Sequence, residues 1–105
     1  MANVRLYTGQ PGTSSAAVAT ATKTTVIFHA AVCNPTASTA WLSVWVVPSG
    51  DAAADDTIIY HEIDISANSQ VALELLPNVT LGAGDALHMQ AETAAALTVH
   101  IFGDQ

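Results

Sequence analysis

The stretch AWLSVWVV, residues 40–47, decides the fold, because a β-strand of this composition is apolar on both faces. Successive side chains of a strand point to opposite sides, so a half-buried strand in an antiparallel sheet alternates apolar with polar residues. The two faces of this stretch carry Leu42, Val44 and Val46 on one side, and Trp41, Ser43, Trp45 and Val47 on the other. The stretch is therefore predicted to be a strand whose second face needs a cover.

The rest of the chain has the pattern of an all-β protein. Turn residues occur about every 8–12 positions, which is typical of sandwiches and barrels. Further strands are expected at residues 24–33, 57–65, 71–76, 86–91 and 97–102. A chain of 105 residues fits one domain. We expect a single antiparallel β-sandwich, jelly-roll or immunoglobulin-like, over residues 24–105, preceded by an N-terminal strand and extended arm over residues 1–23.

The arm is inferred from residues 8–25, which consist mainly of Thr, Ala, Ser and Gly and offer little apolar volume for a core. Such a segment is either a loose tail or an extended strand that completes its hydrogen bonds on a neighbouring subunit. We favour the ordered arm, with Leu6, Tyr7 and Pro11 as its contacts.

Composition and charge exclude several classes of partner. Two basic residues face nine acids, for a formal charge of −7, so the chain is unsuited to nucleic acid or anionic membrane. The single cysteine, Cys33, excludes an internal disulfide and is interpreted as a small buried hydrophobe, with an intermolecular bridge as the alternative. Residues 1–12 lack the apolar core of a secretory signal, so folding in a cytoplasm is expected.

The turn at residues 34–39 predicts a hairpin in which Cys33 faces Ala40. Residues of both strands would then share the second apolar face. That face is covered either by a loop or the arm of the same chain, or by another protein, since aromatic residues concentrate at interface centres. The predicted partner interface consists of Trp41, Trp45, Phe28, Val26 and Val47.

No sequence motif indicates catalysis. The chain has no G-x-S-x-G, no glycine-rich phosphate loop and no H-E-x-x-H, so we expect no enzyme and no cofactor. A hairpin of the last two strands would place His88 opposite His100, but two imidazoles are half of a zinc site. Solvated histidines are the favoured interpretation, and a metal site on this pair is the alternative.

Five segments carry a resemblance to a known group of proteins. They are LYTGQPGTSS (6–15), VIFHAAVCNPTASTA (26–40), WVVPSG (45–50), LGAGD (81–85) and LTVHIFG (97–103). The chain resembles small β-sandwich virion structural proteins of tailed bacteriophages. The resemblance implies a non-enzymatic capsid decoration or cement protein, assembled in the bacterial host cytoplasm, that forms homo-oligomers and docks on the capsid lattice or other virion proteins.

The alternative within this group is a neck, tail or fibre component that binds a receptor or glycan. Both functions suit an aromatic surface, because tryptophans stack on sugar rings as well as on protein. Near the two tryptophans in the sequence there are few Asn, Asp or Arg residues, which would recognise sugar hydroxyls. This favours docking on protein.

Overall fold

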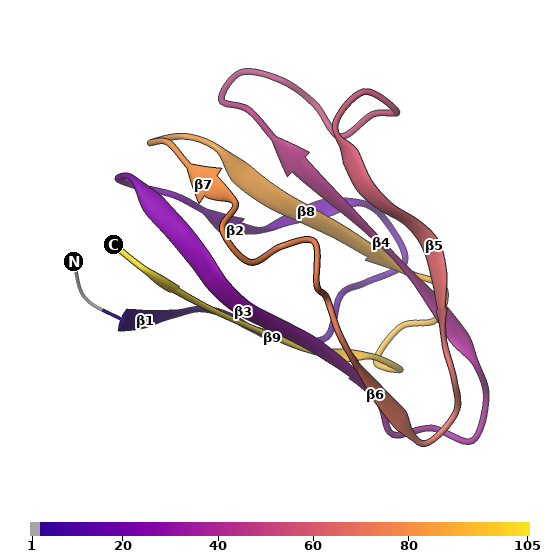
Figure 1. The fold of residues 1–105 in the computed structure, drawn as a ribbon. Helices are drawn as coiled ribbons and strands as arrows, with labels where there is room; N and C mark the ends of the chain where they lie inside the picture. The colour runs from indigo at the N-terminus through magenta and orange to yellow at the C-terminus, as the bar shows by residue number, and fades with distance from the viewer. Residues whose placement is uncertain (1–2) are drawn as a thin grey trace.

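The computed structural model describes residues 3–105, which form two antiparallel sheets packed as a sandwich (Figure 1). Sheet 1 contains, in spatial order, β1 (Asn3–Gly9), β9 (Thr98–Asp104), β3 (Thr25–Asn34) and β6 (Ser69–Ala72), with β7 (Thr80–Leu81) also paired to β3. Sheet 2 contains β2 (Ala16–Thr20), β8 (Ala86–Ala91), β4 (Ala40–Val47) and β5 (Ile58–Ile65). The expected all-β antiparallel sandwich is confirmed. No helix long and apolar enough to cross a membrane occurs within residues 3–105.

The expected extended arm is wrong. Residues 3–9 form an edge strand of sheet 1 paired with β9, and residues 16–20 form an edge strand of sheet 2 paired with β8. Between them, the Gly12 carbonyl accepts a hydrogen bond from the Ala91 amide at 2.8 Å. Small side chains do not prevent this pairing, because an edge strand is held by its backbone and needs little core volume.

The two expected hairpins are also wrong. β3 and β4 lie in opposite sheets, and so do β8 and β9. Cys33 faces Thr98 and Gln70 instead of Ala40, and His100 faces Ala31 and Thr8 instead of His88. The connecting segments 35–39 and 92–97 are long enough to cross the gap of about 10 Å between packed sheets.

The core lies between the sheets and takes most of its residues from the inner strands β3, β4, β8 and β9. Leu87, Met89 and Ala91 of β8 are buried. So are Leu97, Val99 and Ile101, on β9 and directly before it. The largest side chains exposed by less than 2% are Ile27, Leu42, Ile65, Leu73, Leu76, Leu81, Leu87, Met89, Leu97, Ile101, Val32 and Val44.

The strand expected over residues 71–76 ends at Ala72. Beyond it the chain turns, and the Leu76 amide donates to the Leu73 carbonyl at 3.2 Å. Leu73 and Leu76 enter the core, but Val71 and Leu75 are 40% and 58% exposed. In a continuous strand Val71, Leu73 and Leu75 would lie on one face, but the turn after Ala72 ends that alternation.

Tyr7, on β1, gives the stability a dependence on alkaline pH. It packs against the core, and burial raises the pKa of its phenol above the usual value of 10.0. The native state therefore binds the phenolic proton more tightly than the unfolded chain does. The contribution of this group is fully present below the usual pKa and is lost as pH rises through the raised one.

We expect the free energy of unfolding to fall above about pH 10, and to fall less steeply in Tyr7→Phe, which has no proton to release. Urea denaturation of both proteins, followed between about pH 8 and pH 11, measures the two slopes. Equal slopes would assign the alkaline loss to other groups.

Candidate interaction surfaces

The two faces of β4 differ in what covers them. Ala40, Leu42 and Val44 are buried in the core. Trp41 and Trp45 lie on the other side of the strand, outside the core cluster, and both are half-buried. The outer face of sheet 2, centred on these two rings, is the first candidate surface.

Neighbouring strands surround the tryptophans with polar groups. β8 places His88 opposite Trp45, and β5 places Asp64 opposite Trp41. Glu92 also reaches this face, where its Oε1 accepts a hydrogen bond from the Trp41 amide at 3.1 Å. No local sequence pattern indicates these groups, because they come from segments far from residues 40–47.

The predicted partner interface does not form one surface. Phe28 and Val26 lie on β3 in sheet 1, on the opposite side of the sandwich from the tryptophans. The register of β3 shifts at Phe28, and this bulge turns its ring outward to 48% exposure. Val47 shares the side of β4 that carries Trp45, but it is only 3% exposed and so offers a partner almost no surface. Of the five predicted residues, Trp41 and Trp45 share one face and are partly accessible on it.

The outer face of sheet 1 carries an aromatic cluster that sequence reasoning missed. The Phe102 ring stacks with His29 and His100 at centroid distances of 6.2 and 6.5 Å, and the Arg5 guanidinium lies 5.9 Å from its centroid. These residues come from β1, β3 and β9. The cation–π contact between Arg5 and the Phe102 ring contributes about 0.5–1 kcal/mol and holds Arg5 against the sheet.

The histidine pair considered as a metal site is divided between the two sheets, with His88 on β8 and His100 on β9. Within residues 3–105, no three His, Cys, Asp or Glu side chains gather in an arrangement that could hold a metal ion.

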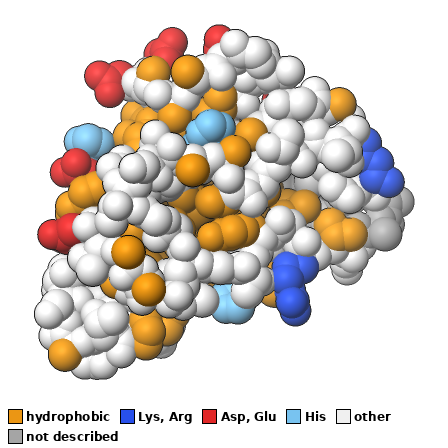
Figure 2. All heavy atoms as spheres, turned by 180° about the vertical axis from the view of Figure 1, so that it is seen from behind, with side chains coloured by type: hydrophobic (Ala, Val, Ile, Leu, Met, Phe, Trp, Pro, Cys, Tyr) orange, Lys and Arg blue, Asp and Glu red, His pale blue; other side chains and the backbone are white. Residues whose placement is uncertain are grey.

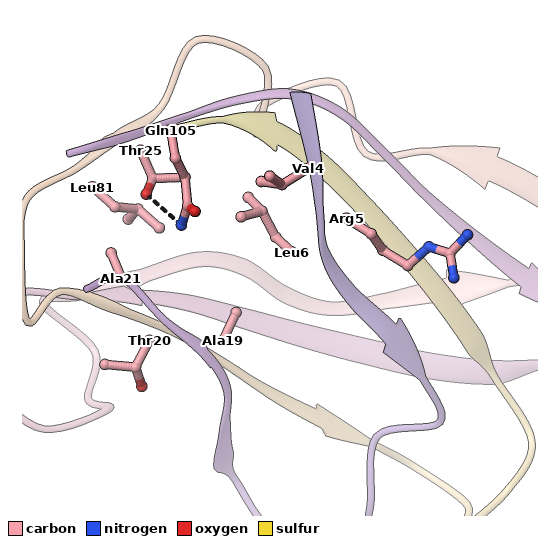
Figure 3. A pocket seen from close by; sticks show the side chains of 9 residues that line it. All are labelled: Val4, Arg5, Leu6, Ala19, Thr20, Ala21, Thr25, Leu81 and Gln105. Atoms are coloured by element: carbon pink, nitrogen blue, oxygen red, sulfur yellow. Dashed lines mark hydrogen bonds between the residues drawn. The ribbon is translucent and has the colours of Figure 1, made fainter. Parts of the chain in front are cut away.

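A cleft of about 330 Å³ opens between the edge strands β1 and β2 (Figure 3). Its lining is Val4, Arg5, Leu6, Ala19, Thr20, Ala21, Thr25, Leu81 and Gln105. Val4 and Leu6 point toward its middle, whereas the Arg5 guanidinium points away from it. At its inner end Gln105 Nε2 donates to Thr25 Oγ1 at 3.2 Å. The walls combine aliphatic side chains with the polar Thr20, Thr25 and Gln105, and the bottom reaches the core at Leu81.

The three residues expected as contacts of the N-terminal arm all pack within the protein itself. Leu6 lines the cleft, Tyr7 packs against the protein's own core, and Pro11 is buried. The structure therefore places these residues within the sandwich.

The opposite edge of the sandwich, formed by β5 and β6, presents exposed aliphatic side chains. Leu75 follows β6, and its amide donates to the Tyr60 hydroxyl of β5 at 2.8 Å. Val71 lies on β6 itself. Leu75 is the most exposed large hydrophobic side chain among the described residues.

Comparison with known proteins adds no assignment, since no family model, curated protein or solved structure matches the chain.

Proposed function

We propose that the chain is a non-enzymatic virion structural protein of a tailed bacteriophage, a capsid decoration protein that docks on the capsid lattice and stabilises the particle. The outer face of sheet 2 is its docking surface. The observation that carries this proposal is the pair of half-buried tryptophans on the central strand β4, outside the protein's own core. Large aromatic side chains in the middle of a surface are the usual anchors of a protein interface.

The order of strand pairing supports the proposal. The chain pairs from its ends inward: β1 with β9, β2 with β8, β3 with β7 and β6, and β4 with β5. We infer from this nested pairing a fold of the jelly-roll kind, which occurs in viral capsid and lectin domains. Fold alone does not assign function, so the argument depends on the surface and on the sequence resemblance to phage virion proteins.

Charge suits the same role. Nine acids against two basic residues give the chain a formal charge of −7. A decorated shell would present this negative charge on its outside and repel other particles. On the outer face of sheet 2, Ile58 of β5 lies opposite Trp45 and adds apolar surface beside it.

Trp45→Ala and Trp41→Ala are each expected to weaken binding to purified phage shells at least tenfold, because a truncated interface anchor costs about 2 kcal/mol. Unfolding should change little, since neither ring packs against the core cluster. Co-sedimentation with shells measures binding, and urea denaturation measures stability.

Phe28→Ala is the matched control, because it removes an exposed ring from the opposite sheet. Shell binding unchanged in both tryptophan variants, or lost equally in Phe28→Ala, would contradict the proposed docking surface.

The second candidate function is glycan binding by a fibre or tail component. The specific observation in its favour is the placement of Asp64, Glu92 and His88 around the tryptophans, which supplies the polar groups that the local sequence lacks. A glycan site must stay open in the assembled particle. Tryptophan quenching by acrylamide on intact particles separates the two: shielded rings support docking, and accessible rings with oligosaccharide binding support the alternative.

A further inference from the structure

We propose that copies of this chain associate edge to edge and head to tail, with Leu75 of one copy seated in the cleft between β1 and β2 of the next. This inference deepens the proposed structural function, because it specifies the self-association that such a protein would use. Its two halves lie on opposite edges of the same sandwich: β1 and β2 flank one edge, and β5 and β6 flank the other.

The receiving half is the cleft between β1 and β2, whose aliphatic side chains face each other across it. Val4 and Leu6 form one wall and Ala19 and Ala21 the other, with Leu81 at the bottom. The two alanines leave the space that larger residues would fill, and the open volume of about 330 Å³ is ample for an aliphatic side chain. Filling such a site with a leucine removes apolar surface from water on both partners.

The inserting half is Leu75. Its side chain is 58% exposed, and its backbone is held by the hydrogen bond from its amide to the Tyr60 hydroxyl. Because that bond fixes the turn, the leucine is presented without a large cost in backbone ordering. Val71, 40% exposed on β6, extends the apolar surface beside it.

The strands at the two edges have directions that match. Along each sheet the four strands β1, β9, β3, β6 and β2, β8, β4, β5 alternate in direction. A copy related by translation therefore brings its β1 antiparallel to β6, and its β2 antiparallel to β5. Within residues 3–105, the outward edges of these four strands have no further strand paired to them. Such edges invite pairing with another chain.

The distribution of charge favours the same head-to-tail arrangement of copies. Arg5 on β1 and Lys23 after β2, the two basic residues of the chain, both lie beside the cleft. Six of the nine acids lie before β5, on it or directly after β6: Asp51, Asp55, Asp56, Glu62, Asp64 and Glu74. Figure 2 shows this separation, with acids at the left and top and the two cations toward the right. Like edges therefore repel, and unlike edges attract.

Association of unlike edges is heterologous, so it produces either a closed ring or an open chain of copies. Both outer sheet faces stay free. The tryptophan surface of sheet 2 remains available for docking, so self-association and docking use separate parts of the molecule.

The test uses the purified full chain in sedimentation velocity over a range of concentrations. We expect the wild type to show a mass that rises with concentration. Leu75→Ser removes the inserting side chain and Ala19→Leu fills the cleft, and each should weaken association at least tenfold. Phe28→Ser is the matched control, because it removes a similarly exposed side chain away from both edges and should leave association unchanged.

Mixing the two variants tests the polarity. Leu75→Ser retains an open cleft and Ala19→Leu retains the inserting leucine, so an equimolar mixture should form a one-to-one complex and nothing larger. A monomeric wild type at all concentrations, variants that associate like the wild type, or a mixture without complex would each overturn the proposal. Near-ultraviolet circular dichroism of each variant identifies misfolding, in which case Leu75→Ala and Ala19→Val replace the two substitutions. This experiment contains no phage shells, so its failure would not contradict the proposed docking function. That function is tested by the shell binding of the tryptophan variants.

Discussion

Replacement of Asn34 by alanine is expected to lower the free energy of unfolding by about 3 kcal/mol, because it removes one buried and three part-buried hydrogen bonds. Asn34 ends β3 and is fully buried. Its Nδ2 donates to the carbonyls of Ser38 and Ile65, each at 2.9 Å, and its Oδ1 accepts from the amide and hydroxyl of Thr36 at 3.0 and 2.7 Å.

The position of these bonds explains the size of the effect. Asn34 belongs to sheet 1, whereas Ile65 ends β5 in sheet 2, so one side chain joins the two layers. The bonds to Thr36 and Ser38 also fix the segment that carries the chain from one sheet to the other. Removal of a buried amide that is satisfied on both its donor and acceptor sides is costly, most of all at the buried bond to the Ile65 carbonyl.

Urea denaturation monitored by tryptophan fluorescence measures the loss. Thr39→Ala, at an exposed position of the same connection, is the control and should change stability by less than about 0.5 kcal/mol. Asn34→Asp keeps the acceptors but turns a carboxylate toward two carbonyls, so it should destabilise at least as much as alanine. A loss below about 1 kcal/mol in Asn34→Ala would show that the connection folds without this residue.

The sequence predicts individual strands better than their partners. β4 runs from Ala40 to Val47 as expected, because its apolar run is bounded by a turn before it and Pro48 after it. Pairing is set by which sheet each strand enters, and a connection of five or six residues permits either a hairpin or a crossing. The strand–turn–strand pattern around residues 34–39, which suggested that Cys33 lies opposite Ala40, is the same for a hairpin and for a crossing between the sheets.

In the candidate surfaces, too, the sequence predicts features within one strand better than contacts between strands. Trp41 and Trp45 are correctly placed outside the core because alternation within one strand determines their side. Phe28 was assigned to their surface through the assumed hairpin, and the bulge in β3 further changed its direction. Arg5, His29 and Phe102 meet through three strands distant in sequence, so no local pattern indicates the cluster.

Leu42→Ala is expected to lower the free energy of unfolding by about 3 kcal/mol, within the range of 2–5 kcal/mol for buried leucines. Leu42 is 0% exposed and belongs to the core cluster between the two sheets. The central strand has little freedom to close the resulting cavity, because β5 and β8 hold β4 on both sides. Since small domains are stable by only 5–15 kcal/mol, the loss should shift the urea midpoint strongly.

Trp41→Ala, one residue earlier, is the matched control because it removes a larger side chain from the outer face of the same strand. It should cost less than Leu42→Ala, even though tryptophan is the larger residue, because its ring lies outside the core cluster. The reverse order would place the Trp41 ring in the internal core and remove the basis for a docking surface on sheet 2. The expected order would assign the inner face of β4 to folding and leave the apolar side chains of its outer face for the docking that we propose.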